Sequence, residues 1–253
     1  MTQRKIALVT GGSRGIGKDI AINLAKKDLD VIITYHQNKA AAEAVTSEIA
    51  KLGGKSHAIQ LDSSDTKGFD AFYQQLSDHL QAQYGSTHFD YLINNAGTGL
   101  YTPFEETTEE QFDEMLNIHF KGVYFLTQKA LPFLKEEGGI VNISSGLARF
   151  TFPNCSAYAS MKGAIEVFTR YLAKELGHRR ITANVVAPGA VATDFGGGAN
   201  RDNEERRKMI ANLTALGRVG EAEDIGSVVA FLCTKDGHWV NGQRIEASGG
   251  TML

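Results

Sequence analysis

Short apolar runs alternate along the chain with longer amphipathic stretches. The runs rich in β-branched residues predict strands over Ile6–Val9, Val31–Thr34, His57–Leu61, Tyr91–Asn94, Ile140–Ile143, Thr182–Val186 and Gln243–Glu246. The amphipathic stretches predict helices over Ile16–Lys27, Ala40–Leu52, Thr66–Gln83, Thr108–Lys135 and Ala157–Leu176. Strands that are apolar almost throughout must be covered on both faces. The alternation therefore predicts an α/β fold, with a doubly wound, seven-stranded parallel sheet and helices on both faces.

The composition is typical of a globular domain. The chain has 253 residues, of which 42% are hydrophobic and 22% are charged, and this balance excludes intrinsic disorder. Because α/β folds of about 250 residues often form single domains, we expect one domain over residues 1–253. The 26 basic and 29 acidic residues give a net charge of −3, so no basic surface favours a nucleic-acid partner.

The sequence shows no signal for a membrane or for secretion. No apolar run approaches the roughly 18 residues that span a bilayer, and Gly11 and Gly12 interrupt the first run. The two cysteines, Cys155 and Cys233, allow one disulfide at most, and a chain of this length needs none. We therefore expect a cytoplasmic protein without membrane contact, with both cysteines as small core residues.

Two segments depart from the regular pattern. Phe195–Arg207 passes from three glycines into a dense charge cluster, which predicts a mobile loop within a substrate loop at about 194–212. This loop is either a lid over a pocket or a solvated surface loop. Thr108–Lys135 carries too many apolar side chains for one helical stripe. Either this helix is fully internal or its second face meets another subunit, and we expect a homo-oligomer, a dimer or a tetramer.

A glycine-rich turn, Thr10–Gly17, follows the first strand and opens a helix. In a Rossmann-type unit, glycines at this point let backbone N–H groups approach a pyrophosphate, although the spacing differs from the usual Gly-x-Gly-x-x-Gly. The same residues match the Gly-x-Ser-x-Gly nucleophile elbow of hydrolases, with Ser13 as the nucleophile. Only one strand precedes Ser13, so half of the oxyanion hole of such a hydrolase would be missing.

The end of the second strand indicates which dinucleotide the turn binds. A cofactor with free ribose hydroxyls usually meets an acidic side chain about 20 residues past the glycines. The sequence here is Thr34-Tyr35-His36-Gln37, without a carboxylate. Arg14 lies in the turn and offers a cation to a 2′-phosphate, unless it is an ordinary solvated side chain. We therefore predict NADP(H) in preference to NAD(H).

Tyr158 and Lys162 stand four residues apart on a predicted helix and so share one face of it. The spacing alone carries little weight, because Tyr35 and Lys39 repeat it. Tyr158, however, follows the strand that ends near Ser145, at the sheet edge that carries the glycine turn. An ammonium about 4 Å from a phenol contributes roughly 4 kcal/mol at an effective dielectric of 20. We expect Lys162 to lower the pKa of Tyr158 by roughly two to three units at most.

Together these motifs resemble the short-chain dehydrogenase/reductase family, in its subgroup of about 250 residues. The resemblance covers residues 4–250 in the family's order and spacing. It is carried by Thr10–Gly17, Asp62, Asn94–Gly97, Asn117, Ser145, Tyr158, Lys162, Pro188–Thr193, Gly217-Arg218 and Asn241–Gln243.

The resemblance implies hydride transfer between a nicotinamide and a carbonyl or alcohol carbon. Tyr158 would be the general acid or base, and Lys162 would lower its pKa and bind the nicotinamide ribose. Ser145, with Ser144 as the fallback, would hold the substrate oxygen, and Asn117 would position a water for proton relay. The residues expected at the cofactor are Gly11, Ser13, Arg14, Gly15, Ile16, Gly17, Tyr35, His36, Asp62, Asn95, Ala96, Gly97, Tyr158, Lys162, Pro188, Gly189, Val191 and Thr193.

Some of these residues have a purely structural alternative. Asn94 and Asn95 could tie the fourth strand to its neighbours through side-chain hydrogen bonds, and Asn117 could be an ordinary polar helix residue. No metal-ligand spacing occurs and the histidines are scattered, so we expect no catalytic metal.

The residues expected around the substrate are mostly apolar or aromatic: Leu100, Tyr101, Arg149, Phe150, Phe152, Cys155 and Phe195. They favour a small-molecule carbonyl or alcohol substrate of hydrophobic character. Arg149 could instead bind an acidic substrate or the phosphopantetheine of an acyl carrier, as in a 3-oxoacyl-acyl-carrier-protein reductase. A non-catalytic NADP-binding regulator is disfavoured because Ser145, Tyr158 and Lys162 are all present.

Overall fold

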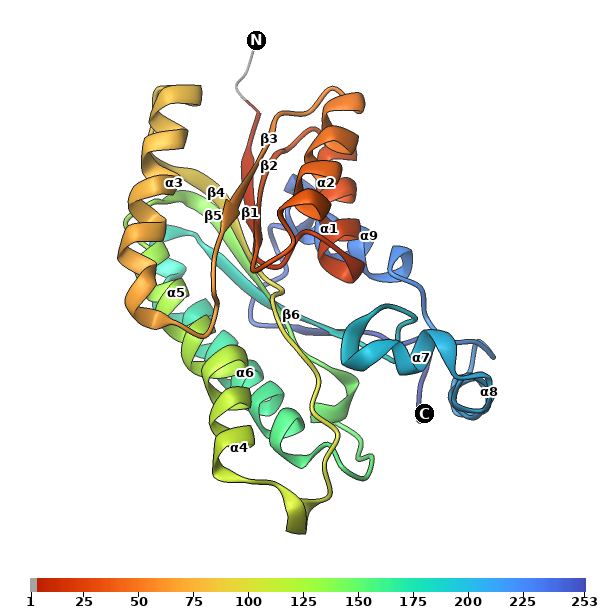
Figure 1. Cartoon of the computed structure of the whole chain (residues 1–253). Helices are drawn as coiled ribbons and strands as arrows, with labels where there is room; N and C mark the ends of the chain where they lie inside the picture. The colour runs from red at the N-terminus through yellow and green to blue at the C-terminus, as the bar shows by residue number, and fades with distance from the viewer. Residues whose placement is uncertain (1–3) are drawn as a thin grey trace.

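The structure is a computed structural model that describes residues 4–253. Within them one sheet contains seven parallel strands in the order β3-β2-β1-β4-β5-β6-β7 (Figure 1). The strands are β1 (Ile6–Val9), β2 (Asp30–Tyr35), β3 (Ser56–Gln60), β4 (Phe89–Asn94), β5 (Leu134–Ile143), β6 (Thr182–Pro188) and β7 (Arg244–Ala247). The predicted doubly wound α/β fold is confirmed. The strand order reverses between β1 and β4, and ligands of such sheets bind at the carboxyl ends of the strands at this point.

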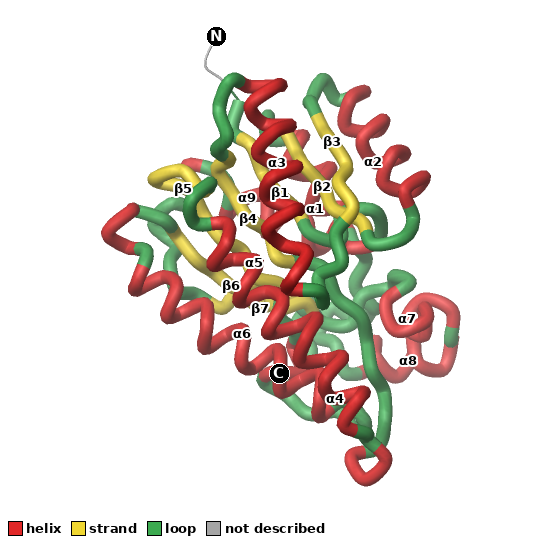
Figure 2. The backbone as a smooth tube through the Cα atoms, turned by 60° about the vertical axis from the view of Figure 1, so that its left-hand side comes forward, coloured by secondary structure: helices red, strands yellow, loops and turns green. Residues whose placement is uncertain are grey.

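Helices cover both faces of the sheet. On one face lie α1 (Gly15–Lys26), α2 (Lys39–Lys51) and α9 (Glu223–Leu232). On the other lie α3 (Phe69–Tyr84), α5 (Gly122–Ala130) and α6 (Ser156–Glu175), which stand in front of the sheet in Figure 2. Short helical turns, labelled η, occur at η1 (Thr66–Gly68), η2 (Phe104–Glu106), η4 (Gly146–Ala148), η5 (Gly177–Arg179) and η7 (Lys235–Gly237).

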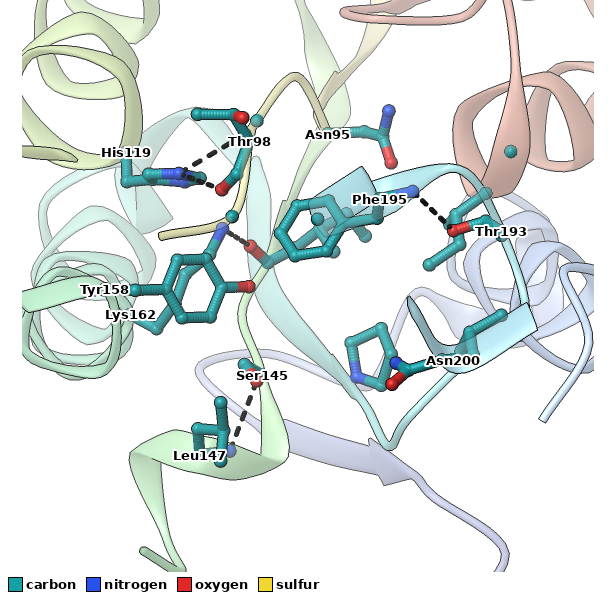
Figure 3. Close-up of a pocket in the computed structure, with 18 of the residues that line it drawn as sticks. Asn95, Thr98, His119, Ser145, Leu147, Tyr158, Lys162, Thr193, Phe195 and Asn200 are labelled. Atoms are coloured by element: carbon teal, nitrogen blue, oxygen red, sulfur yellow. Dashed lines mark hydrogen bonds between the residues drawn. The ribbon is translucent and has the colours of Figure 1, made fainter. Parts of the chain in front are cut away.

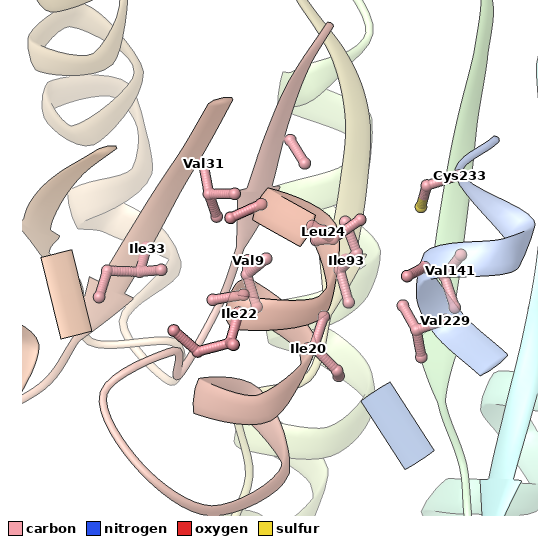
Figure 4. Packing of buried hydrophobic residues seen from close by; sticks show 14 of the residues in the cluster. Val9, Ile20, Ile22, Leu24, Val31, Ile33, Ile93, Val141, Val229 and Cys233 are labelled. Atoms are coloured by element: carbon pink, nitrogen blue, oxygen red, sulfur yellow. The ribbon is translucent and has the colours of Figure 1, made fainter. Parts of the chain in front are cut away.

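The two cores lie on opposite faces of the same strands because successive side chains of a strand alternate between faces. In β1, Ala7 and Val9 belong to the core beneath α1, α2 and α9, whereas Ile6 and Leu8 belong to the core beneath α3, α5 and α6. Figure 4 shows the first core, with Val9 beside residues of α1. All four side chains are fully buried. The strand therefore has no exposed face, and its carboxyl end is held in place from both sides.

The segment predicted as one helix over Thr108–Lys135 is not a single helix. It contains α4 (Glu109–Leu116), a π-helical turn η3 (Asn117–Lys121) and α5, and β5 already begins at Leu134. A capping box between Thr108 and Gln111 starts α4. A Cβ on Gly122 would overlap the carbonyl oxygen of Ser63. The helix backbone therefore packs closely against the loop after β3 at the point where the π-helical turn ends.

The segment predicted as a loop at 194–212 is largely helical. It forms η6 (Phe195–Gly198), α7 (Ala199–Asp202) and α8 (Glu204–Asn212). Residues 196–198 are all glycines with φ between 60° and 79°, a region that favours glycine over other residues. Helix α8 buries only Ile210, so it lacks the apolar stripe by which a helix is recognised in a sequence.

Apolar side chains remain exposed on the outer surface of α5 and α6. Tyr124 and Phe125 of α5 are 39% and 37% exposed, and Val167 and Tyr171 of α6 are 46% and 63% exposed. The alternative of a fully internal helix is therefore wrong, and the homo-oligomer stays a prediction. No helix within residues 4–253 has the length and apolar character that crossing a membrane requires.

Candidate active site

A cavity of about 970 Å³ lies at the carboxyl ends of the central strands. Its lining includes every residue that the sequence assigned to the cofactor, together with Ser145, Tyr158 and Lys162. These residues come from the carboxyl ends of β1, β2, β3, β4, β5 and β6, from the turns that follow them and from helix α6. Asn117 does not belong to the lining. The structure thus brings together the predicted site residues with this one exception.

The glycine turn after β1 leaves a row of backbone donors without partners. The N–H groups of residues 13–17 form no hydrogen bond with another residue of the described chain. Arg14 is the N-cap residue of α1, but its side chain accepts no hydrogen bond from the first turn of the helix. Gly11 has a φ of 64°, and a Cβ there would lie 2.9 Å from Cα of Ala96. A Cβ on Gly17 would overlap the carbonyl oxygen of Gly11. The turn needs glycine at these positions, and its free N–H groups suit an anionic ligand.

Asn95 holds the glycine turn against the end of β4. Its Nδ2 donates to the carbonyl oxygens of Thr10, at 2.9 Å, and of Gly11, at 3.2 Å. Asn94 donates to Oγ1 of Thr127 and to Oδ1 of Asn142, at 2.9 and 2.8 Å. The structural alternative is therefore correct for both asparagines, and Asn95 in addition lines the cavity.

Two contacts between a basic and an acidic side chain lie along the cavity near the glycine turn and the end of β2. His36 Nε2 lies 3.6 Å from Oδ2 of Asp62. Arg14 Nη1 lies 3.3 Å from Oδ2 of Asp194, and both side chains are largely exposed. Asp194 also pairs with Arg201, at 2.8 Å. Because exposed ion pairs contribute little free energy, Arg14 can leave Asp194 for another anion at small cost.

Tyr158, Lys162 and Ser145 converge where α6 meets the end of β5 (Figure 3). Lys162 Nζ donates to the carbonyl oxygen of Ile143 at 2.8 Å and lies 5.5 Å from the centroid of the Tyr158 ring. Ser144, the fallback for Ser145, instead donates to Glu166 Oε1 at 2.8 Å. Ser145 Oγ accepts the N–H of Leu147, at 3.2 Å, and the Ser145 hydroxyl also interacts with that of Tyr158.

The pKa values of this pair differ from the expectation. Burial raises the pKa of Tyr158 well above its usual value of 10, and a hydrogen bond with Ser145 only partly opposes this effect. Burial lowers the pKa of Lys162 to about 8. The expected lowering of the Tyr158 pKa by Lys162 is therefore wrong for the protein alone, because burial disfavours the charged tyrosinate and raises the pKa instead.

His119 is a site residue that the sequence analysis missed. It lies in the π-helical turn, is 1% exposed, and its ring stands perpendicular to that of Tyr158 with the centroids 5.0 Å apart. Nε2 lies 2.8 Å from the carbonyl oxygen of Thr98 and 3.4 Å from its backbone nitrogen (Figure 3). The shorter contact requires a proton on Nε2, so Nδ1 carries the lone pair. Nδ1 is buried and has no partner among residues 4–253.

His119 is neutral at pH 7. Burial, and after it the charge of Lys162, hold the pKa of the imidazole well below its usual range. The segment Asn117–Lys121 therefore presents a buried hydrogen-bond acceptor to the cavity at His119. The only signal in the sequence was a histidine between the apolar residues Ile118 and Phe120, two positions after Asn117.

The substrate end of the cavity contains most of the aromatic side chains predicted for it. Tyr101, Phe150, Phe152, Cys155 and Phe195 line it, and the Phe195 ring lies 5.8 Å from that of Tyr158. Leu100 is absent from the lining and packs behind it, in the small core around Tyr158.

Arg149 does not face the cavity, so its predicted contact with an acidic substrate is wrong. Its Nε and Nη2 each donate to Glu246 at 2.8 Å, and Nη2 also donates to the carbonyl oxygen of Thr251. This bidentate pair neutralises the guanidinium and occupies its Nε and Nη2 donors.

Comparison with known proteins decides whether the cavity belongs to an oxidoreductase or to a serine hydrolase. A family model described as enoyl-(acyl carrier protein) reductase matches residues 11–252. A solved structure of a short-chain dehydrogenase/reductase from Serratia marcescens BCRC 10948 is 34% identical, covers 99% of both chains and has a TM-score of 0.91. The chain belongs to the short-chain dehydrogenase/reductase family. It is therefore an oxidoreductase, and the serine hydrolase alternative for Ser13 is excluded.

Two further members of the short-chain dehydrogenase/reductase family are similar over nearly the whole chain. The hydroxynaphthalene reductase-like protein Arp2 of Metarhizium majus (strain ARSEF 297) is 40% identical over 98% of this chain and 95% of its own length. The structure of the angucycline C-6 ketoreductase LanV with bound NADP is 38% identical, covers 98% of this chain and 96% of its own, and has a TM-score of 0.94.

Proposed function

We propose that the protein uses NADPH to reduce a ketone group on an aromatic or otherwise apolar compound. The observation that carries this proposal is the convergence of Tyr158, Lys162 and Ser145 in a cavity that continues to the glycine turn. The names of the relatives agree with it, because they describe a hydroxynaphthalene reductase-like protein and an angucycline C-6 ketoreductase.

The cavity fits a dinucleotide with a 2′-phosphate. The unpartnered N–H groups of residues 13–17 suit its pyrophosphate, and the glycines leave room for its close approach. No carboxylate stands at the end of β2, where Tyr35 and His36 line the cavity. Arg14 can turn from Asp194 to the 2′-phosphate. Pro188, Gly189, Val191 and Thr193, in the turn after β6, would hold the nicotinamide end.

The reduction needs a hydride at the carbonyl carbon and a proton at its oxygen. Reduced nicotinamide supplies the hydride. The hydroxyls of Tyr158 and Ser145 donate to the carbonyl oxygen, and Tyr158 transfers its proton to that oxygen as it becomes an alcohol. Because burial raises its pKa, Tyr158 is protonated at neutral pH and available as this donor. Lys162 stabilises the tyrosinate that forms.

His119 takes the place that the family resemblance gave to Asn117. Its Nδ1 is the buried acceptor beside the catalytic pair, while its bond to Thr98 fixes the ring. We assign to it the positioning of a water that returns a proton to Tyr158 by way of Lys162. Lys162, with a pKa of about 8, can exchange a proton near neutral pH.

The proposed function is tested by following oxidation of NADPH, and of NADH beside it, over a panel of acceptors. The panel contains 1-tetralone, a naphthoquinone, a 3-oxoacyl thioester and an enoyl thioester. We expect turnover of the aromatic ketone with NADPH. Tyr158→Phe should lower kcat by about 10²- to 10⁴-fold while NADPH still binds. Tyr171→Phe, on the exposed side of the same helix, is the control and should leave kcat unchanged.

Other outcomes would replace this proposal. Turnover of the enoyl thioester without any ketone would make the protein an enoyl reductase, as the description of the family model states. A preference for the 3-oxoacyl thioester would favour the acyl-carrier alternative. Tight NADPH binding without turnover of any acceptor would favour the regulator.

A further inference from the structure

Arg206 lies at the substrate end of the cavity, on helix α8. Its Cζ stands 5.2 Å from the centroid of the Tyr101 ring, and its Nε donates to Oδ1 of Asn200 at 2.7 Å. Asn200 also lines the cavity and is labelled in Figure 3. The backbone N–H of Arg206 donates to Oδ1 of Asn203, the residue that caps α8. Two separate contacts therefore hold this side chain, one with the Tyr101 ring and one with Asn200, and a freely solvated arginine would lack both.

The guanidinium of Arg206 has no carboxylate partner within residues 4–253. Its neighbours on the same segment do: Arg201 pairs with Asp194 and Asp202, and Arg207 with Glu221. Among the other arginines of the described chain, only Arg170 also lacks an ion pair, and Arg170 is exposed. Arg206 is partly buried. A partly buried guanidinium without a counterion in a cavity is free to pair with an anionic group of a ligand.

The charge of Arg206 reaches the groups around Tyr158. Burial raises the pKa values of Tyr101 and Cys155, and the charge of Arg206 opposes both shifts. Both groups in turn interact with the Tyr158 hydroxyl. Arg206 and Tyr158 line the same cavity, together with Tyr101 and Cys155.

We propose that Arg206 binds an oxyanion of the substrate, a carboxylate or an ionised phenol on the aromatic ketone that Tyr158 protonates. This inference rests on the proposed function and narrows its substrate class. The planar guanidinium presents two parallel N–H donors to such an anion, and Tyr101 packs against its face. The 2′-phosphate of the cofactor is a different ligand, which we assigned to Arg14 in the glycine turn.

Direct binding tests Arg206 without requiring turnover. The probes are 2-naphthoate and its methyl ester, which have the same ring but differ in charge, and 4-nitro-1-naphtholate as the phenolate. Each is titrated by calorimetry into the protein saturated with NADP⁺. We expect the wild type to bind naphthoate or nitronaphtholate about 10- to 100-fold more tightly than the ester, the range for a charged hydrogen bond. The anion that binds more tightly shows whether Arg206 prefers a carboxylate or a phenolate.

The variant Arg206→Gln should remove this preference. It removes the charge but keeps a side chain that can bond Asn200, and its ratio of anion to ester affinity should fall to about 1. Lys208→Gln is the matched control: it removes one charge from an exposed residue of the same helix and should keep the wild-type ratio. A wild type that binds the ester as tightly as both anions would overturn the proposal. So would an unchanged ratio in Arg206→Gln.

The turnover panel distinguishes this inference from the proposed function. If no ketone is reduced while the anions still bind through Arg206, the proposed reaction fails and the anion site stands. If 1-tetralone is reduced but the anion preference is absent from the binding data, the reductase stands and the anion site fails.

Discussion

The two ends of the active-site cavity are built by different means. At the cofactor end, backbone N–H groups and glycines form the surface, and β1 and β4 hold it from a fully buried core. At the substrate end, side chains of α8 and of the turn after β5 form the surface, and α8 buries only Ile210. The first end is fixed by the fold itself. The second can change its chemistry through single side chains without disturbing the sheet.

A methyl group at the cofactor end should have the largest effect. In Gly17→Ala the new Cβ overlaps the carbonyl oxygen of Gly11, so the turn must open and NADPH should bind roughly 100-fold more weakly. Titration of NADPH fluorescence measures this change. Gly163→Ala is the control: nothing lies within 4 Å of its Cβ in α6, so the free energy of unfolding should rise by about 0.5–1 kcal/mol. Equal NADPH affinity in wild type and Gly17→Ala would contradict the proposal that the backbone N–H groups of the glycine turn bind the pyrophosphate.

This difference also explains which parts of the molecule the sequence predicts. The strands and the glycine turn are recognised because local rules, such as period-two burial and the conformational freedom of glycine, determine them. Helix α8 was predicted as a loop because its polar sequence has no apolar stripe.

Pairings between distant residues are beyond such local rules. Arg149 was assigned to the substrate because nothing near it in the sequence indicates that Glu246, 97 residues later, takes its charge. His119 was missed because only the π-helical turn brings it to Tyr158.

Substitutions of His119 should have an intermediate effect. Phenylalanine keeps a ring against Tyr158 but removes both nitrogens, and kcat should fall on the order of 10-fold with little change in KM. Asparagine keeps a donor for Thr98 and an acceptor in place of Nδ1, and should recover most of the rate. Steady-state kinetics with 1-tetralone measure both variants. If packing alone matters, the order reverses and phenylalanine is the better substitute.

Arg14→Ala should have the smallest effect on NADPH binding, because Arg14 is an exposed side chain. The rest of the cofactor end consists mainly of backbone N–H groups and glycines. We expect NADPH to bind about 3- to 5-fold more weakly, NADH to bind as before, and the melting temperature to change little. Arg201→Ala is the matched control, since it also frees Asp194 but lies outside the cavity. An unchanged ratio of NADPH to NADH affinity in Arg14→Ala would assign the 2′-phosphate to other residues, with His36 the next candidate.

The π-helical turn has a consequence for how α4 and α5 are related. An α-helix advances about 100° per residue, and the wider turn at Asn117–Lys121 holds an extra residue, so the helical phase of α4 does not continue into α5. The apolar positions of Thr108–Lys135 follow two phases, which is why they exceed one stripe when they are counted as a single helix. Deleting one residue from this turn would restore a regular helix, but it would also rotate His119 away from Tyr158.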